Sequence, residues 1–236
     1  MSEQTPSQPA QKKNNIFKDL IFNIIIPTLI LTKFSSDEYL GPTMGIVVAL
    51  AFPIAYGLWD LKQSGKVNGI SILGIVSVFL TGGISLLELD PKYIAIKEAM
   101  IPGIIGVAVL VSQFTKYPLV KTFILNEQMV NLTLLYKELE EQGKRALFDK
   151  KVNFSSLIVA ASFFLSSALN YILAKWIVVS QPGTEAYNEE LGKMTALSYP
   201  VIVIPSMILL VAAVWYLFVQ MKRLTGKNIE HFLNEQ

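Results

Sequence analysis

The sequence has no cysteine, a single histidine and few charged residues, and each absence excludes a class of site. Without cysteine the chain cannot form a disulfide, a thiolate metal site or a cysteine nucleophile. The single histidine, His231, lies outside every long apolar run, so no serine–histidine pair or HExxH zinc motif can form within those runs. A Gly-rich phosphate-binding loop is also absent from the sequence. The residue inventory therefore predicts a protein that is not an enzyme and holds no metal or other cofactor.

Long apolar runs, by contrast, are abundant. Hydrophobic residues make up 52% of the chain and charged residues 16%, and the apolar residues follow one another without the periodicity of a soluble core. Because a helix needs about 20 mostly apolar residues to cross roughly 30 Å of hydrocarbon, we predict an all-α, polytopic membrane protein. Its six transmembrane helices are expected at about residues 16–34, 41–61, 69–87, 93–114, 154–179 and 197–220.

The segments between and beyond these spans are too short for a separate soluble domain. Residues 1–15 are rich in Gln, Asn, Ser and Pro and are expected to form a disordered tail. Residues 16–220 form the predicted membrane domain, with a long loop at 116–152 and a polar loop at 180–196, and residues 221–236 form a second tail. The first span lacks a small-residue cleavage site, which favours a retained signal anchor.

Lysine and arginine are distributed unevenly between alternate connecting segments. Fifteen lie in the N-terminal tail, the second and fourth loops and the C-terminal tail, against three (Lys33, Lys92 and Lys193) in the other loops. Because basic segments tend to stay on the cytoplasmic side, both termini are predicted to be cytoplasmic. The basic residues flank spans without an aromatic platform between them, which favours contacts with anionic lipids over binding of nucleic acid.

The long loop contains an amphipathic pattern, which we call the loop stripe. Its apolar residues alternate at spacings of four and three, which predicts a cytoplasmic helix that begins near Pro118. The stripe consists of Leu125, Met129, Leu132, Tyr136 and Leu139. One interpretation is a helix in the membrane interface whose basic neighbours reach anionic headgroups. These neighbours are Lys144, Arg145, Lys150 and Lys151. The other interpretation is a docking surface for a protein partner or a second copy of the chain.

Two adjacent charges, Lys97 and Glu98, interrupt the fourth apolar run, which extends from Tyr93 to Val111. Ionisable residues within a span are costly and mark functional sites. Lys97 can extend its ammonium group to the interface, whereas Glu98 is shorter and needs a proton or a cation such as Lys97 or Lys175. A structural ion pair and a proton or solute pathway both remain open.

Polar residues also follow one side of the fifth span. This helical face carries four of them, at spacings of seven, four and four: Ser155, Ser162, Ser166 and Asn170. Small hydroxyl and amide side chains on such a face commonly form hydrogen bonds between helices. If Glu98 faces the same interior, these residues would instead line a polar cavity with it.

Prolines and small residues within the spans provide helix-packing signals. Four prolines are each expected to kink a helix: Pro27, Pro53, Pro102 and Pro205. Similar apolar contexts around Pro27 and Pro102 are consistent with an inverted repeat of three spans per half, as in many transporters. A small-residue face formed by Gly41, Gly45 and Ala49 would serve packing within one chain or a homo-oligomer.

Several short elements in the second half of the chain resemble one known family. The stretch from Pro102 to Thr122 contains Val111-Ser112-Gln113 and Tyr117-Pro118-Leu119-Val120-Lys121, and the next span contains Phe163-Phe164 and Leu169-Asn170-Tyr171. These elements resemble the Pro-bearing fourth span, the basic turn and the Phe-Phe and Leu-Asn-Tyr elements of the intracellular septation protein A family. The resemblance covers mainly Pro102 to Val178. The whole chain is closer to a sister group of six-span bacterial proteins, some of them labelled as transporters.

The resemblance implies a bacterial inner-membrane protein with a role in envelope biogenesis, integrity or septation. It also implies envelope-synthesis or division proteins as partners, and it implies no catalytic residue. The residues themselves support a second class, a secondary transporter or channel for an ion, a small solute or a lipid headgroup. Its polar site would consist of Lys97, Glu98, Ser162, Ser166 and Asn170.

Overall fold

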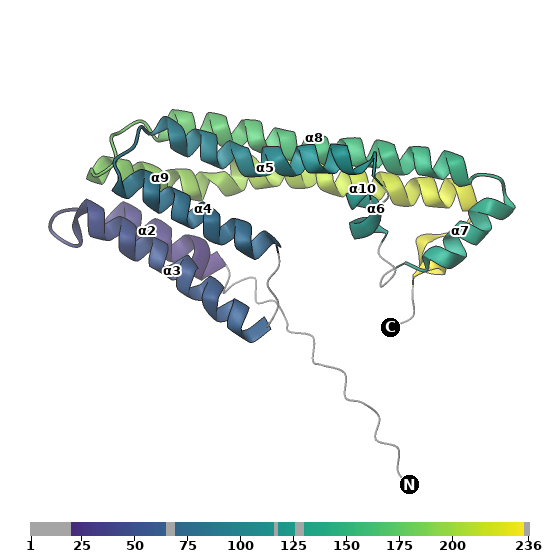
Figure 1. Cartoon of the computed structure of the whole chain (residues 1–236), viewed down its shortest axis with the longest axis horizontal. Coiled ribbons are helices and arrows are strands. Elements are labelled where there is room, and N and C mark those ends of the chain that lie inside the picture. Colours follow the sequence, from purple (N-terminus) through teal and green to yellow (C-terminus); the bar gives the residue numbers. More distant parts are fainter. Residues whose placement is uncertain (1–19, 65–68, 116–117, 126–129, 234–236) are drawn as a thin grey trace, which may run out of the picture.

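The computed structural model describes residues 20–64, 69–115, 118–125 and 130–233, and over these ranges the protein is all-helical (Figure 1). The one β-type pairing in this part of the chain is an isolated bridge between Val130 and Leu233. The prediction of an all-α fold is therefore confirmed.

The helices lie in this order along the chain. The first half contains the π-turn η1 (Ile21–Ile25), α2 (Ile26–Lys33), α3 (Gly41–Ser64), α4 (Gly69–Leu86) and α5 (Lys92–Ser112). The second half contains α6 (Leu119–Ile124), α7 (Leu132–Glu141), α8 (Arg145–Ile177), α9 (Glu185–Ser198), the π-turn η2 (Tyr199–Val203), α10 (Ile204–Thr225) and the short 3-10 turn η3 (Ile229–Phe232).

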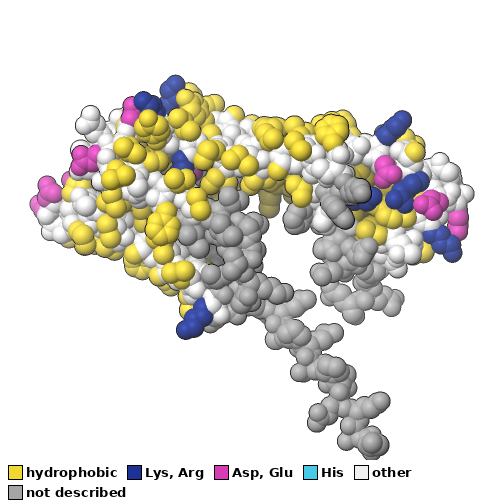
Figure 2. All heavy atoms as spheres, in the orientation of Figure 1, with side chains coloured by type: hydrophobic (Ala, Val, Ile, Leu, Met, Phe, Trp, Pro, Cys, Tyr) yellow, Lys and Arg dark blue, Asp and Glu magenta, His cyan; other side chains and the backbone are white. Residues whose placement is uncertain are grey.

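Four helical segments of the described residues are long and apolar enough to cross a membrane. They are Gly41–Trp59, Lys92–Ser112, Arg145–Ile177 and Glu185–Thr225. Two shorter apolar helices, Ile21–Lys33 and Val76–Leu86, lie where two further spans are predicted from the sequence. Most of the charged side chains visible in Figure 2 lie toward the two ends of the long axis, with hydrophobic side chains on the surface between them. This distribution is that of a protein whose middle faces lipid.

Three long helices, α5, α8 and α10, run along the long axis, and α8 packs against both α5 and α10 (Figure 1). At one end, α9 packs against α2 and α3, and α4 connects to α5. We call this the α9 end, and we call the opposite end, which carries α7 and η3, the α7 end. From the α9 end, α2, α3 and α4 lean away from α5, α8 and α10 (Figure 1). These two groups of helices therefore diverge.

Glycines on α5 allow α8 to approach closely. A Cβ atom at Gly103 would lie 3.2 Å from the hydroxyl oxygen of Ser167, and one at Gly106 would lie 3.1 Å from the ring of Phe164. Ser167 also donates a 2.7 Å hydrogen bond to the carbonyl oxygen of Ala99. Close backbone approach together with a hydroxyl–carbonyl bond is a common mode of helix packing in membranes.

Two of the prolines lie directly after π-turns. Pro27 follows η1 and Pro205 follows η2, each as the second residue of the next α-helix. A proline ring clashes with the carbonyl group four residues earlier, which here belongs to Asn23 and Val201 inside the π-turns. The wider turn moves that carbonyl away from the ring, so each helix continues across its proline.

The prediction of a polar loop at residues 180–196 is wrong, because the chain there forms α9, which continues through η2 into α10. Thr184 caps α9 by accepting a hydrogen bond from the backbone N–H of Tyr187. A Cβ atom at Gly192 would lie 2.6 Å from Cγ2 of Thr32, so glycine is required for this contact between α9 and α2. Charged residues on the other side of α9 lower the average hydropathy of the segment and conceal its narrow buried face.

Candidate intramembrane polar site

Lys97 and Glu98 lie in the second turn of α5, which is one of the helices able to cross a membrane. Counted from Lys92 at the start of α5, Lys97 lies about 8 Å along the helix axis, at 1.5 Å per residue. The pair therefore lies at the α9 end, inside the apolar segment that follows the connection between α4 and α5.

Lys97 is buried, and oxygen atoms surround its ammonium group. The side chain is 5% exposed, and Nζ lies 2.6 Å from Oε1 of Glu98. The same nitrogen donates hydrogen bonds to the hydroxyl oxygens of Ser77 at 3.2 Å and Thr81 at 2.8 Å, both on α4. An ammonium group has three N–H donors, so each donor has an oxygen within reach. Lys97 thus turns toward α4 instead of extending to the interface.

Ser77 and Thr81 are positioned by the geometry of α4. They are four residues apart, which places both on the side of α4 that faces Lys97. The hydroxyl of Thr81 donates to the carbonyl oxygen of Ser77 at 3.0 Å, which leaves its lone pairs available to Lys97. Neither residue was predicted from the sequence. The signal that could have identified them is a pair of hydroxyl side chains four residues apart within an apolar run.

Glu98 lies on the side of α5 that faces the other helices. Ile94 and Val109 share this side by helical spacing, and both are buried. The side chain of Glu98 nevertheless keeps 26% of its surface exposed. The surrounding helices therefore leave space beside the carboxylate. Of the two charged side chains, Glu98 is the more exposed.

The polar residues of α8 make other contacts. Ser162 donates a 2.7 Å hydrogen bond to the carbonyl oxygen of Ser206 on α10, and Asn170 donates a 2.8 Å bond to the carbonyl oxygen of Ser166 within α8. None of the hydrogen bonds or ion pairs found among the described residues joins these α8 residues to the Lys97–Glu98 pair. The Ser162 bond corresponds to packing between helices, one of the two interpretations left open by the sequence, whereas the Asn170 bond stays within α8.

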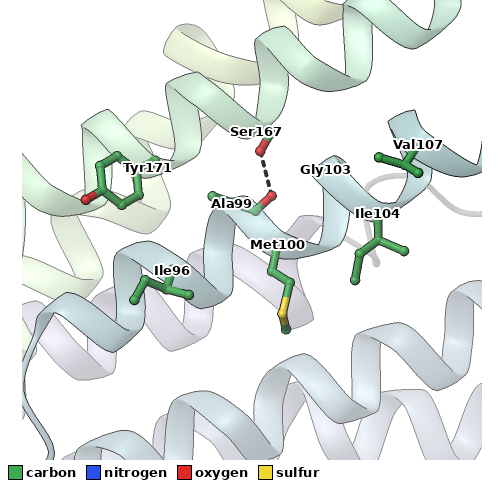
Figure 3. Close-up of a pocket in the computed structure, with 8 residues that line it drawn as sticks. All are labelled: Ile96, Ala99, Met100, Gly103, Ile104, Val107, Ser167 and Tyr171. Carbon is green, nitrogen blue, oxygen red and sulfur yellow. Dashed lines mark hydrogen bonds between the residues drawn. The ribbon is translucent and has the colours of Figure 1, made fainter.

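An apolar groove lies between α5 and α8, on the side of α5 opposite Glu98 (Figure 3). Its volume is about 510 Å³, and it is lined by Ile96, Ala99, Met100, Gly103, Ile104, Val107, Ser167 and Tyr171. No charged residue lines the groove, and the hydroxyl of Ser167 is already bonded to Ala99. Ile104 is exposed, so the groove opens to the apolar surface of the protein. This groove is suited to lipid chains and not to a polar solute.

The long loop between α5 and α8 is folded differently from the prediction. The prediction of a single helix that begins near Pro118 is wrong, because the described residues form two short helices, α6 and α7. Asn131 begins α7 by accepting a 3.0 Å hydrogen bond from the backbone N–H of Leu134. Residues 145–152, predicted as loop, already belong to α8. α7 packs against α8 and α10.

The loop stripe is packed inside the protein at the α7 end. Leu125 and Leu139 are 1% and 0% exposed and form one cluster with Leu132 and Tyr136, whereas Met129 lies outside the described residues. The residues that cover the stripe come from α8, α10 and η3: Phe148, Val152, Leu217, Met221, Leu224 and Phe232. The described residues of the stripe are therefore packed within the chain, and they do not form a free surface.

Two basic residues beside the stripe are engaged within the chain. Lys144 donates a 2.7 Å hydrogen bond to the carbonyl oxygen of Leu224 near the end of α10, where helical carbonyls lack partners. The guanidinium carbon of Arg145 lies 3.4 Å from the centre of the Tyr136 ring, and Arg145 also pairs with Glu140 at 3.4 Å. These contacts engage both side chains within the protein, although the Arg145 side chain stays 30% exposed.

Glu138 of α7 connects the loop to the C-terminal segment. Its Oε1 atom accepts a hydrogen bond from Nζ of Lys227 and lies 3.0 Å from Nε2 of His231. The Glu138 side chain is 11% exposed. The hydrogen bond from Lys227 lowers the pKa of Glu138, burial opposes this shift, and His231 adds to the lowering. The last described turn is thereby attached to α7.

Comparisons with known proteins identify no relative, so a function has to be argued from the fold and the site. No protein-family model, no curated protein and no solved structure matches this chain. The resemblance of residues 102–178 to the intracellular septation protein A family therefore stays a prediction. The fold and the site define a class: all-helical proteins with helices able to cross a membrane and, on one of them, an ion pair between a buried lysine and a partly exposed glutamate.

Proposed function

We propose that the protein is a non-catalytic, polytopic protein of the bacterial inner membrane that moves a proton, an ion or a small polar solute past the Lys97–Glu98 pair. The observation that carries this proposal is the pair itself. Lys97 is buried and lies 2.6 Å from Glu98, which stays partly exposed on the inward side of α5. Charges within spans are costly and are retained mainly where they act on ions, protons or substrates.

The position of the pair supports transport over a purely structural role. Lys97 bonds α5 to Thr81 of α4, at the place where the two diverging groups of helices meet (Figure 1). In many transporters a polar site lies between two groups of helices, which rock around it to open alternately to each side. A partly accessible carboxylate at such a junction is suited to this mode of action.

In the proposed topology six segments cross the membrane and the α7 end faces the cytoplasm. The spans are η1 with α2, then α3, α4, α5, α8 and α10. The basic residues of the α7 end support this orientation: Lys137, Lys144, Arg145, Lys150, Lys151, Lys222, Arg223 and Lys227. Lys150, Lys222 and Arg223 are exposed, which supports contacts with anionic lipids in this orientation.

A role in envelope maintenance is the second candidate, and the resemblance of residues 102–178 favours it. In this role the protein was expected to dock partners through the loop stripe, which the chain itself covers. The two functions are compatible, because a transporter of an envelope precursor would serve both. The Lys97–Glu98 pair is then the working part in either case.

Flux measurements in liposomes test the proposal. Purified protein is reconstituted with internal dyes that report protons, sodium, potassium or chloride. We expect the wild type to move at least one of these ions faster than empty liposomes, and Glu98→Gln to reduce that flux at least about tenfold. Glu189→Gln is the matched control, because Glu189 forms an exposed pair with Lys193 at 2.7 Å, and it should leave the flux unchanged. Equal flux in Glu98→Gln and wild type would exclude the role of the pair.

Complementation tests the envelope role separately. The gene is deleted in its bacterium, and the cells are challenged with osmotic shock and detergent. Rescue by the wild type but not by Glu98→Gln, at matched protein levels in the membrane, supports an envelope function that uses the pair. A deletion strain without any envelope defect contradicts this second candidate and leaves the transport proposal to the flux measurements.

A further inference from the structure

We infer that the groove between α5 and α8 binds one acyl chain of a membrane phospholipid, whose phosphate group pairs with Lys175. This inference goes beyond the proposed function and does not depend on transport past the Lys97–Glu98 pair. It follows from the apolar lining of the groove, from its length and from the cation at one of its ends.

The lining of the groove is suited to a hydrocarbon chain. Its volume of about 510 Å³ lies in the range of small-molecule sites, and its side chains are apolar apart from Ser167 and Tyr171 (Figure 3). The hydroxyl of Ser167 already donates a 2.7 Å hydrogen bond to the carbonyl oxygen of Ala99. Tyr171 lies one turn further along α8, at the part of the groove nearer to the α9 end. The rest of the groove therefore offers a ligand apolar contacts.

The length of the groove corresponds to one leaflet of a bilayer. On α5 its lining residues extend from Ile96 to Val107, eleven positions apart, which is about 16 Å at 1.5 Å per residue. This is about half of the roughly 30 Å thickness of the hydrocarbon core. Tyr93 and Trp176, at the α9 ends of α5 and α8, are 44% and 77% exposed, as aromatic residues at a membrane interface are. The groove thus extends from this interface toward the middle of the membrane, as one acyl chain does.

A cation lies at the interface end of the groove. The Nζ atom of Lys175 is 5.7 Å from the centre of the Tyr171 ring, and this ring lines the groove. Lys175 is exposed, and none of the ion pairs found among the described residues includes it. Lys92, at the start of α5, is instead paired with Asp90 at 3.0 Å. Lys175 is therefore the cation placed to pair with the phosphate group of a lipid whose chain lies in the groove.

Photo-crosslinking of the full-length protein in detergent micelles tests the site. The probe is a phosphatidylglycerol with a photoreactive diazirine near the end of one acyl chain, and peptide mass spectrometry locates the adducts. We expect the adducts to concentrate around Val107, at the inner end of the groove. Unlabelled phosphatidylglycerol should compete for this labelling, whereas diacylglycerol with the same chains lacks the phosphate and should compete about fivefold less.

Two pairs of variants test the two ends of the lipid. Lys175→Gln should reduce the labelling about fivefold. Lys193→Gln is its control and should leave the labelling unchanged, because Lys193 is exposed and already pairs with Glu189 at 2.7 Å. Ala99→Phe places a ring in the groove and should reduce the labelling at least about tenfold. Ala108→Phe, at an exposed position of α5 outside the lining, is the control. If Ala99→Phe does not fold, the exposed Lys175 pair of variants still decides.

The outcomes separate the inference from its alternatives. Adducts spread evenly over the apolar surface, or labelling that Lys175→Gln leaves unchanged, would overturn the inference. Equal competition by diacylglycerol would also overturn it. A dimer that light scattering detects and that Ala99→Phe dissociates would place a second copy of the chain in the groove instead of a lipid. None of these results bears on ion flux past the Lys97–Glu98 pair, so the inference and the proposed function fail separately.

Discussion

Lys97 on α5 donates a 2.8 Å hydrogen bond to the hydroxyl of Thr81 on α4, and this bond joins two helices that diverge toward the other end of the protein (Figure 1). The same ammonium group neutralises Glu98 at 2.6 Å. One side chain therefore determines both the charge balance of the site and the packing of the helices around it. A change in either is expected to affect the other.

The bond between Lys97 and Thr81 is predicted to contribute measurably to stability. Thr81→Val keeps the shape of the side chain and removes an acceptor from a buried cation, so we expect the free energy of unfolding to fall by about 1.5–3 kcal/mol. Denaturant titration in mixed micelles measures this loss. The control is Thr195→Val, because the Thr195 hydroxyl bonds within its own helix, to Leu191 at 2.9 Å. Equal losses in both variants would contradict a specific contribution of the bond.

The buried ion pair is predicted to depend on both partners. Lys97→Met leaves Glu98 without its counter-charge, and we expect a loss of about 3 kcal/mol, at the low end for buried pairs because Glu98 is partly exposed. Lys97→Met/Glu98→Gln should recover most of this loss. Lys193→Met breaks the exposed pair with Glu189 and should cost only about 0.3–0.5 kcal/mol. If the double variant were as unstable as Lys97→Met, charge pairing would not be the cause.

The attachment of the C-terminal segment to α7 is predicted to weaken in acid. The hydrogen bond from Lys227 holds the pKa of Glu138 below its ordinary value, with burial opposing and His231 adding to the shift. A carboxyl with a depressed folded pKa contributes stability that is complete above its unfolded pKa, about 4.3, and that is lost as the pH falls through the folded pKa.

Limited proteolysis of the C-terminal segment over this pH range measures the effect. We expect Glu138→Gln to be cleaved faster than wild type at neutral pH and equally fast in acid, because protonation then removes from the wild type the charge that the variant lacks at every pH. Glu140→Gln is the matched control, since Glu140 is 66% exposed. A difference between Glu138→Gln and wild type that persists unchanged in acid would show that the charge of Glu138 is not responsible.

The contact between α9 and α2 is predicted to tolerate no side chain at Gly192. A Cβ atom there would lie 2.6 Å from Cγ2 of Thr32 and 3.3 Å from the carbonyl oxygen of Thr28, so Gly192→Ala should destabilise the protein by about 1–3 kcal/mol. Gly57→Ala is the control, because an added Cβ atom meets no described atom within 4 Å. It should instead stabilise α3 by up to about 1 kcal/mol. Thermal unfolding in detergent distinguishes the two, and equal effects would contradict the packing argument.

The long apolar helices were predictable because their signal is local. The predicted span at 93–114 corresponds to α5 at Lys92–Ser112, since an uninterrupted apolar run defines a helix that can cross a membrane. α9 was not predictable in the same way. Its buried face is one glycine-lined side of a charged helix, and its partner α2 lies more than a hundred residues earlier in the chain. Average hydropathy does not record such a contact.

The charged residues and the hydroxyl residues of the candidate site also differ in how well the sequence predicts them. Lys97 and Glu98 stand out because charges are rare in apolar runs, whereas Ser77 and Thr81 are ordinary residues of a span until the pairing of α4 with α5 places them beside Lys97. For the loop stripe, the spacing of Leu139 indicates an apolar helix side but not what covers it. That information lies in distant residues of α8, α10 and η3.

The covering of the loop stripe has a consequence for the order of events during translation. Leu139 is synthesised about ninety residues before Phe232, which completes its cover. Until α10 and η3 have been made, the apolar side of α7 can pack only on the first turns of α8, and the nearest further apolar phase is the membrane interface. We therefore expect the interfacial helix indicated by the amphipathic pattern to be a state of the nascent chain, which the finished protein replaces when its last turn closes over α7.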